Sequence, residues 1–216
     1  MSEADRKVEV IEKRTLYRGY ARLYEYRLRH SLHAGGMSAE ITREVLARGH
    51  AVLILPYDPV RDEVVMIEQF RIGPFANGDQ PWTLEAVAGM IEAGEAPEDV
   101  ARREMREEAG LELQDLTHAF DCYTSPGAVS EQISIYCARV DATDAGGIHG
   151  VREEGEDIKV IVMTFDDVMA ALSDGRINVG PVIAAVQWLA LHREQIRKRW
   201  LEQFSINGGR SRDRSD

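Results

Sequence analysis

Apolar and polar residues alternate along most of the first fifty positions of the chain, and this alternation predicts β-strands. Residues 7–33 alternate with several tyrosines among them, and residues 38–46 follow a Gly-Gly turn as a partner strand. A segment of this size is too small to bury a core of its own. We therefore expect a small antiparallel β domain over residues 1–48. Its exposed strand edges favour pairing with a second copy, which predicts a homodimer through the N-terminal strands.

A second group of strands begins after this segment. Residues 50–58 are nearly all apolar, as in a central strand, and residues 63–71 return as a neighbour. Residues 73–81 are predicted to form a loop. Further strands are expected at residues 82–88, 116–124, 131–142 and 157–165, with a long polar, glycine-containing loop over residues 142–157.

Three helices are predicted among these strands. Pro97 suits a first helical position and Gly110 a helix end. Thr164 and Asp167 form a capping box for a second helix, which ends at Gly175. Pro181 opens the last helix, which has an apolar stripe at Val182, Val186, Leu189, Ile196 and Trp200. From residue 206 to residue 216 the chain is polar and glycine-rich, and we expect a disordered tail there.

The first of these helices carries an unusual concentration of acidic residues. Glu104, Glu107 and Glu108 are three or four residues apart and share one side of the helix. Arg103 offsets part of their repulsion, and a divalent cation would offset more, because hard ions such as Mg²⁺ bind several carboxylate oxygens. Taken alone, the same residues also fit a solvated acidic surface.

Composition narrows the classes of function. The chain has 216 residues, a hydrophobic fraction of 44% and a net charge of −11. An acidic chain is not expected to bind a nucleic-acid backbone as its main partner, whereas a phosphate substrate remains compatible because metal ions invert the local field. Cys122 and Cys137 suggest reduced thiols of a cytoplasmic protein, with a disulfide as the alternative. We expect neither a signal peptide nor a transmembrane helix.

The spacing around the acidic helix resembles a known family. From Gly89 the sequence continues with five residues, Glu95, seven residues, Arg103-Glu104-Met105, one residue, Glu107-Glu108, one residue and Gly110-Leu111. Every specified position of the Nudix box, GX5EX7REUXEEXGU, is met, so the chain resembles the Nudix hydrolases. The resemblance implies an α/β/α sandwich over residues 49–205, with a mixed β-sheet between helices, beside the N-terminal antiparallel β domain. It also implies Mg²⁺- or Mn²⁺-dependent cleavage of a nucleoside diphosphate linked to another group.

Pro126 points to one subgroup of that family. It lies fifteen residues past the box in SPGAVSE, a context that resembles the Nudix hydrolases of ADP-ribose. This resemblance implies hydrolysis of ADP-ribose to AMP and ribose 5-phosphate. One alternative is the same chemistry on a sugar nucleotide such as GDP-mannose or on NADH. Another is a non-catalytic Nudix domain that senses a nucleotide or binds a partner. The intact set of box glutamates argues against the second alternative.

The resemblance also assigns roles around the metal. Two or three ions would be held by Ala88, through its carbonyl, and by Glu104, Glu108 and Glu156. Glu107 would share a metal, and Arg103 would brace the box glutamates with Glu95 nearby. Glu154 would act as the general base, on a loop that closes over the substrate. The adjacent Glu153 is an alternative for either loop role, and the loop as a whole also fits a solvated segment.

Four further residues are implied to bind the substrate, with Pro126 marking the substrate class. Arg71 would contact the phosphates, for which a guanidinium is suited. Glu131 would contact the terminal ribose. Tyr20 and Arg43 would stack on the adenine, although sheet packing for Tyr20 and a surface charge for Arg43 are the simpler interpretations.

Overall fold

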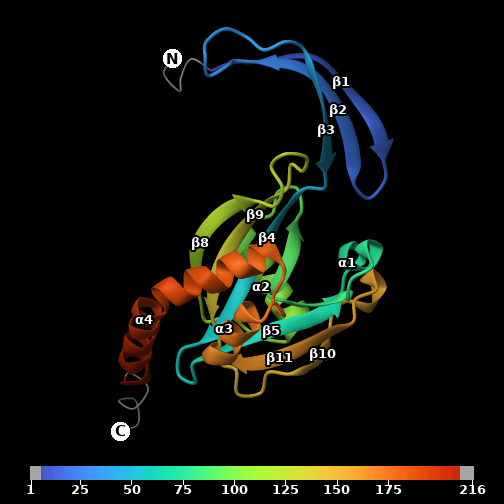
Figure 1. Ribbon diagram of the computed structural model, residues 1–216. Helices are drawn as coiled ribbons and strands as arrows, with labels where there is room; N and C mark the ends of the chain where they lie inside the picture. The colour runs from blue at the N-terminus through green and yellow to red at the C-terminus, as the bar shows by residue number, and fades with distance from the viewer. Residues whose placement is uncertain (1–5, 210–216) are drawn as a thin grey trace. The chain divides into compact units, whose positions relative to one another are not determined.

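The computed structural model describes residues 6–209, with side chains described through residue 202. The chain divides into two compact units (Figure 1). One comprises Met1–His50 with Tyr123–Gln132, and the other comprises Ala51–Cys122 with Ile133–Asp216. The N-terminal unit thus includes a loop that the sequence analysis assigned to the second domain.

The N-terminal unit is a three-stranded antiparallel sheet in the order β1-β2-β3. Its strands are β1 (Val8–Arg18), β2 (Arg22–His30) and β3 (Ile41–Ala47). The loop from the rest of the chain reaches this sheet at the end of β3, where Leu46 pairs with Val129. Large apolar side chains remain exposed on it, namely Val8, Val10, Ile11, Leu16, Tyr17, Tyr20, Leu32, Met37 and Leu46. The sheet therefore buries little of its own apolar surface.

The second unit is built on an eight-stranded mixed sheet in the order β10-β11-β5-β4-β9-β8, with β6 paired to β5 and β7 to β4. β4 and β9 run parallel, whereas β5 is antiparallel to β4, β6 and β11. The strands are β4 (His50–Asp58), β5 (Glu63–Phe70), β6 (Trp82–Glu85), β7 (Val87–Ile91), β8 (Asp115–Tyr123), β9 (Gln132–Arg139), β10 (Gly147–His149) and β11 (Ile158–Thr164).

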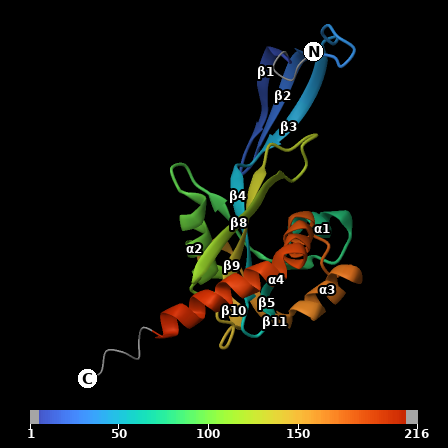
Figure 2. The same ribbon diagram turned by 90° about the vertical axis from the view of Figure 1, so that its left-hand side faces the viewer.

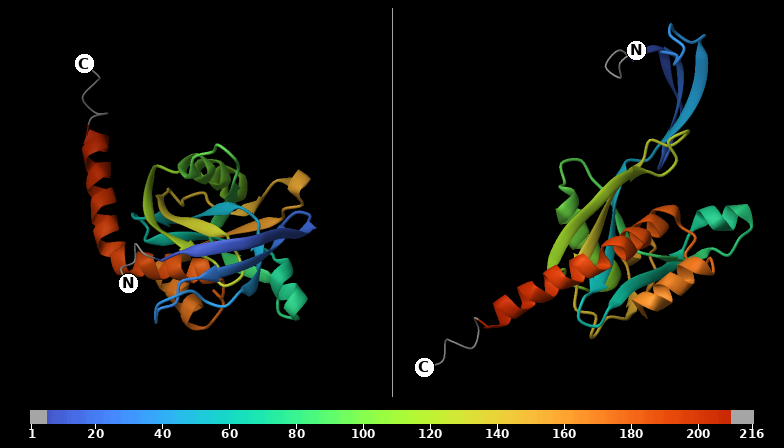
Figure 3. Two further views of the ribbon diagram at one scale, coloured as in Figure 1. Left: turned by 90° about the horizontal axis from the view of Figure 1, so that it is seen from above. Right: turned by 60° about the vertical axis from the view of Figure 1, so that its left-hand side comes forward.

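Helices cover both faces of this sheet, which confirms the predicted sandwich. They are α2 (Pro97–Ala109), α3 (Phe165–Ser173) and α4 (Gly180–Gly209), whereas the short helix α1 (Ile72–Asn77) contains no buried residue. Figures 2 and 3 show α2 on one side of the sheet and α3 on the other. Alternate residues of β4 enter the two cores: Ile54 packs with α2, and Leu55 packs with α3 and α4. Burial on both faces explains why β4 is apolar throughout.

Several local predictions need correction. Residues 72–77 form a short helix instead of a loop, closed by Gly78 in a left-handed conformation whose N–H donates to the Phe75 carbonyl at 3.1 Å. The predicted loop over residues 142–157 contains β10 and a 3₁₀ turn over Arg152–Glu154. Helix α4 continues to Gly209, past the expected start of the tail at residue 206, and residues 210–216 lie outside the described part. None of the described helices combines the length and apolar character needed to cross a bilayer.

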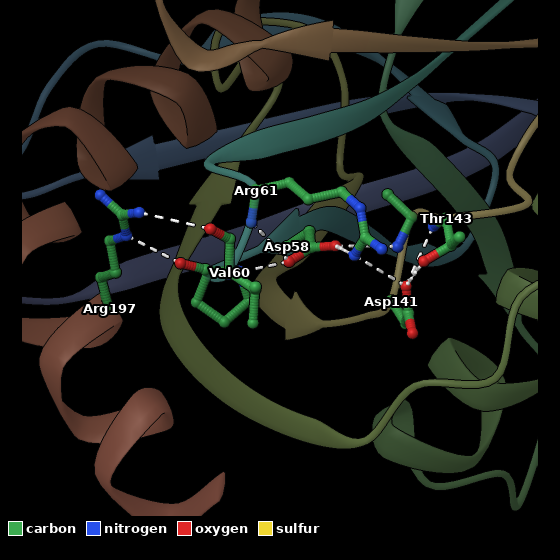
Figure 4. Close-up of polar contacts among 8 residues, drawn as sticks. Asp58, Val60, Arg61, Asp141, Thr143 and Arg197 are labelled. Atoms are coloured by element: carbon green, nitrogen blue, oxygen red, sulfur yellow. Dashed lines mark hydrogen bonds and ion pairs between the residues drawn. The ribbon is translucent and has the colours of Figure 1, made fainter.

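A buried carboxylate fixes the corner between β4 and β5 (Figure 4). Asp58 is 1% exposed and accepts N–H groups from the two residues that follow Pro59, from the Arg61 guanidinium at 2.8 Å and from Ala142 at 3.0 Å. Arg197 of α4 reaches the same corner, where its Nε donates to the Pro59 carbonyl at 2.7 Å. The corner thus joins β4 to the segment after β9 and to the last helix.

We expect Asp58→Ala to lower the free energy of unfolding by about 2–4 kcal/mol, because it removes the acceptor of several buried donors at once. Urea denaturation followed by tryptophan fluorescence measures this. Asp144→Ala changes an exposed aspartate two residues after Ala142. It serves as the control and should change the free energy of unfolding by no more than about 0.5 kcal/mol. Equal midpoints for the two variants would contradict this role of Asp58.

Candidate active site

Helix α2 carries two glutamates into a buried position against the sheet. Its apolar stripe, Ala101, Met105 and Ala109, packs in the core, so Glu104 and Glu108, which are one residue away on the helix surface, are drawn in with it. They are 8% and 2% exposed. The N–H of Ala88 in β7 donates to Glu108 Oε2 at 2.9 Å. The strand and the helix together therefore define the place of both carboxylates.

Gly89, the first residue of the box, is required by close approach. A Cβ atom added at this position would lie 1.9 Å from Glu104 Oε1, far inside van der Waals contact. The Glu104 carboxylate occupies the space that any side chain at position 89 would need. A glycine in β7 is thus the condition for seating Glu104 beside the strand.

Arg103 links the acidic side chains of the box. Its Nη1 donates to Glu104 Oε1 at 2.7 Å and to Glu107 Oε2 at 3.0 Å. Its Nη2 lies 3.7 Å from Glu95 Oε2. Glu95 also accepts the N–H of Glu92 at 2.9 Å. The structure thus brings these box residues into one network around a single guanidinium.

Burial changes the acidity of the two inner carboxyl groups. Desolvation raises the pKa of Glu104 to about 7, with Arg103 acting in the opposite direction. Desolvation also raises the pKa of Glu108 to about 8, against the effect of the Ala88 N–H. The charge of Glu156 raises both values further. Hard oxygen donors whose negative charge is disfavoured by burial fit a site for a divalent cation such as Mg²⁺.

The predicted third carboxylate has a different partner in this structure. Glu156 Oε2 accepts the N–H of Val151 in its own loop at 2.9 Å. In the described part of the chain, no group of three or more His, Cys, Asp or Glu side chains is gathered closely enough to hold a metal ion. The structure therefore places Glu104 and Glu108 together, and leaves Glu156 within electrostatic range of them.

The loop that carries Glu154 and Glu156 is attached to the C-terminal end of α2. The N–H of Gly150 donates to the Glu107 carbonyl at 3.0 Å. The His149 ring fills the space beside Gly110, where an added Cβ would lie 2.5 Å from the ring carbon Cε1. The sequence analysis did not predict this contact of His149. The final glycine of the box thus both ends the helix and admits the loop.

Arg71 lies at the end of β5 and is held by a residue that sequence reasoning also missed. Its Nε and Nη2 donate to the two carboxylate oxygens of Glu85 at 2.9 and 2.8 Å. Thr83 Oγ1 donates to the same carboxylate at 2.5 Å. Glu85 is a charged residue in the mostly apolar segment that leads to the box. Its charge at such a position was the sequence signal that could have identified it.

The remaining predicted residues belong to the N-terminal unit. Glu131 is 7% exposed and pairs with Arg48, whose Nε lies 3.1 Å from its Oε1. Tyr20 is 89% exposed at the turn between β1 and β2. Arg43 is exposed on β3 opposite Tyr26, four residues along the strand from the end nearest that turn. Within one copy of this sheet, Tyr20 and Arg43 are therefore not neighbours. Pro126 lies in the loop that joins the unit.

Comparison with known proteins covers most of the chain. The model of the NUDIX domain matches residues 47–186. The chain is 49% identical over 193 residues to an ADP-ribose pyrophosphatase of Escherichia coli (strain K12), covering 89% of this chain and 92% of that protein. It is 33% identical over 187 residues to a GDP-mannose pyrophosphatase of Yersinia enterocolitica, covering 86% and 96%. A crystal structure of an ADP compounds hydrolase has the same fold, with a TM-score of 0.68 at 22% identity, covering 88% of this chain and 97% of that one.

The raised pKa values predict how stability depends on pH without metal. Both lie above the value of 4.5 for an unperturbed glutamate. Between about pH 4.5 and 8 the native state therefore binds more protons than the unfolded state, so stability falls as the pH rises. We expect Glu108→Gln to make this fall shallower and to raise the free energy of unfolding at pH 8 by on the order of 1–2 kcal/mol.

Chemical denaturation in a chelator at several pH values between 4.5 and 8 measures this dependence. Glu112→Gln changes a side chain that is 75% exposed directly after the box, and it should keep the wild-type slope. A Glu108→Gln protein that is no more stable than the wild type at pH 8 would show that burial of Glu108 carries no such penalty.

Proposed function

The chain belongs to the Nudix hydrolase family, and we propose that it hydrolyses the diphosphate of ADP-ribose to AMP and ribose 5-phosphate. The observation that carries the proposal is the buried pair Glu104 and Glu108, seated against β7 beside Ala88 and Gly89. Buried carboxylates can bind a negatively charged substrate when a cation lies between them and that substrate. The 49% identity to the E. coli ADP-ribose pyrophosphatase supports this choice of substrate.

The proposed cofactor is Mg²⁺, with Mn²⁺ as a substitute. Glu104, Glu108, Glu156 and the carbonyl of Ala88 would hold it, with Glu107 sharing a metal. When bound, such ions neutralise the diphosphate and lower the pKa of a bound water. Glu156 Oε2 accepts the N–H of Val151, and its other carboxylate oxygen would be available to the metal.

The chain's own groups would move the proton and orient the site. Glu154 would take the proton from the attacking water as general base, a contribution of about 10²–10⁴-fold. It lies on the 3₁₀ turn over Arg152–Glu154, between Gly150 and Gly155, and is exposed. Glu153, on the same turn, is the alternative base. Arg103 would hold the box carboxylates in position through its hydrogen bonds to Glu104 and Glu107.

Substrate binding is proposed to involve four further residues. Arg71 is proposed to bind the phosphates with the part of its guanidinium that Glu85 does not occupy. Glu131 is proposed to bind the terminal ribose. Tyr20 and Arg43 are proposed to stack on the adenine, and since they are not neighbours within one copy of the sheet, each would come from a different copy of the proposed homodimer. The large exposure of Tyr20 leaves its ring free for such a contact.

Three alternatives keep the same fold. GDP-mannose is favoured by the relative from Yersinia enterocolitica, although its identity of 33% is lower than the 49% of the E. coli protein. NADH would need the same diphosphate chemistry. A non-catalytic, nucleotide-sensing domain is the less supported alternative, because every box glutamate is present and Arg103 joins them in one network.

The proposed assembly is a homodimer through the N-terminal strands, and the proposed compartment is the cytoplasm. Val8 and Val10 on β1 are 65% and 56% exposed, and β1 is an outer strand of its sheet. Apolar side chains on an unpaired edge are a surface for association. Cys122 and Cys137 are both free thiols, which suits a reducing compartment.

The activity is tested by AMP release from ADP-ribose with Mg²⁺, beside GDP-mannose and NADH at equal concentration. We expect the wild type to hydrolyse ADP-ribose fastest. Glu108→Gln and Glu154→Gln should each lower kcat by at least about 100-fold, because one weakens the metal site and the other removes the base.

Glu112→Gln, at an exposed position directly after the box, serves as the control and should keep wild-type rates. Wild-type rates in both Glu108→Gln and Glu154→Gln would contradict the proposed roles of these residues as metal ligand and general base. A faster reaction with GDP-mannose or NADH would replace the proposed substrate while leaving the family unchanged.

The assembly is tested by sedimentation equilibrium. We expect a wild-type mass of twice that of the chain, and a mass of one chain for Val10→Glu, because a charge would then lie in the contact. Glu9→Gln, at the neighbouring position on β1, is the control and should remain dimeric. A monomeric wild type, or a dimeric Val10→Glu variant, would argue against assembly through this strand.

A further inference from the structure

A group of polar side chains is buried between β5 and β6, on the side of the sheet that packs against α2. In the antiparallel register of these strands, Ile67 lies opposite Glu85, and Gln69 lies opposite Thr83. Ile67 belongs to the core under α2. Because opposite residues share a face of the sheet and faces alternate along a strand, Gln69, Thr83 and Glu85 lie on that same face.

Arg71 continues this face beyond the end of β5. Its backbone is extended and its N–H donates to the Pro81 carbonyl at 2.8 Å. It lies two residues after Gln69, so its side chain emerges on the same face. The guanidinium then turns back to Glu85, which binds it through both carboxylate oxygens.

This arrangement is costly if it serves stability alone. Glu85 is 5% exposed, Thr83 is 3% exposed and Gln69 is 6% exposed. In the part of the chain with described side chains, Gln69 Nε2 is buried with no hydrogen-bond partner. Apolar residues of similar volume often stabilise a protein as well as a buried ion pair, or better. The polar group on this face therefore calls for a reason beyond packing.

The geometry at Arg71 supplies that reason. Glu85 holds Nε and Nη2, which leaves the two N–H groups of Nη1 for another acceptor. The Arg71 side chain is 45% exposed while that of Glu85 is 7% exposed. Burial lowers the pKa of Arg71, but Glu85 together with the charges of Glu108 and Glu156 raises it overall. The held guanidinium is thus reachable from solvent and lies in the field of the candidate metal site.

We propose that Glu85 is a positioning residue that acts through Arg71, fixing the guanidinium so that Nη1 binds the diphosphate of the substrate. This inference rests on the proposed function, since it assigns Glu85 to the binding step of that reaction. Thr83 supports the arrangement by holding the Glu85 carboxylate. A guanidinium fixed before binding loses less freedom when the phosphate arrives, which favours affinity.

A double-mutant cycle tests the proposal through binding and catalysis together. Wild type, Glu85→Gln, Arg71→Ala and the double variant are compared for KM, for kcat and for the Kd of the methylene analogue of ADP-ribose with Mg²⁺. We expect Glu85→Gln to raise KM and Kd about tenfold and Arg71→Ala to raise them on the order of 100-fold. The double variant should bind no more weakly than Arg71→Ala.

The split between KM and kcat separates positioning from simple damage to the fold. A loss of folded protein lowers the apparent kcat and leaves KM and Kd unchanged, whereas a misplaced guanidinium raises KM and Kd. The proposal would be overturned if the increases in Kd caused by the two single substitutions multiplied in the double variant. An unchanged Kd for Glu85→Gln would also overturn it.

Two further variants serve as a control and as a test without a change of charge. Glu68→Gln makes the same change on β5, on the opposite face of the sheet and paired with Lys159 at 4.0 Å, and should leave KM and Kd at wild-type values. Thr83→Val removes one hydrogen bond from Glu85 without a change of charge. It therefore tests the positioning of Arg71 even if a variant that changes a charge does not fold. We expect a two- to fivefold rise in its Kd, and an unchanged Kd would overturn the proposal.

The same cycle separates this inference from the proposed function. If the wild type hydrolyses no ADP-ribose but another nucleotide of the panel, the substrate is wrong, and the cycle is measured on that nucleotide. If the wild type hydrolyses ADP-ribose and the cycle shows no coupling, the proposed function stands and the role of Glu85 is wrong.

Discussion

The candidate active site depends on keeping two carboxylates buried between a helix and a strand. The apolar stripe of α2 packs into the core and carries Glu104 and Glu108 in with it. Gly89 leaves room for one of them, and the N–H of Ala88 meets the other. Burial makes their negative charge costly, which raises both pKa values. A bound cation would remove that cost, so the packing of one helix links the fold to the chemistry.

The other parts of the site in the second unit are arranged around the same helix. The loop with Glu154 is attached to its C-terminal end through the bond from Gly150 to the Glu107 carbonyl. The face of β5 and β6 that α2 covers carries Glu85 and, beyond it, Arg71. The proposed base, the proposed metal ligands and the proposed phosphate-binding residue thus all lie on or next to one rigid helix, which favours a fixed geometry for catalysis.

The sequence allowed prediction of those features that depend on local spacing. The apolar run of residues 50–58, the helix limits at Pro97 and Gly110, and the box residues follow from periodicity, capping and a fixed register, and the fold confirms the first two. The pairing of Arg71 with Glu85 was not predictable, because these residues are fourteen positions apart in sequence and meet only through the register between β5 and β6. Attachment of residues 123–132 to the N-terminal unit likewise depends on a tertiary contact.

The central claim is that the buried carboxylates of α2 exist to bind a divalent ion. A titration with Mn²⁺, followed by the loss of the free-ion electron paramagnetic resonance signal at neutral pH, tests it most directly. We expect uptake by the wild type in the presence of the methylene analogue of ADP-ribose, and its loss in a protein with Glu104→Gln and Glu108→Gln together. Equal uptake by both proteins, or none by the wild type, would contradict it.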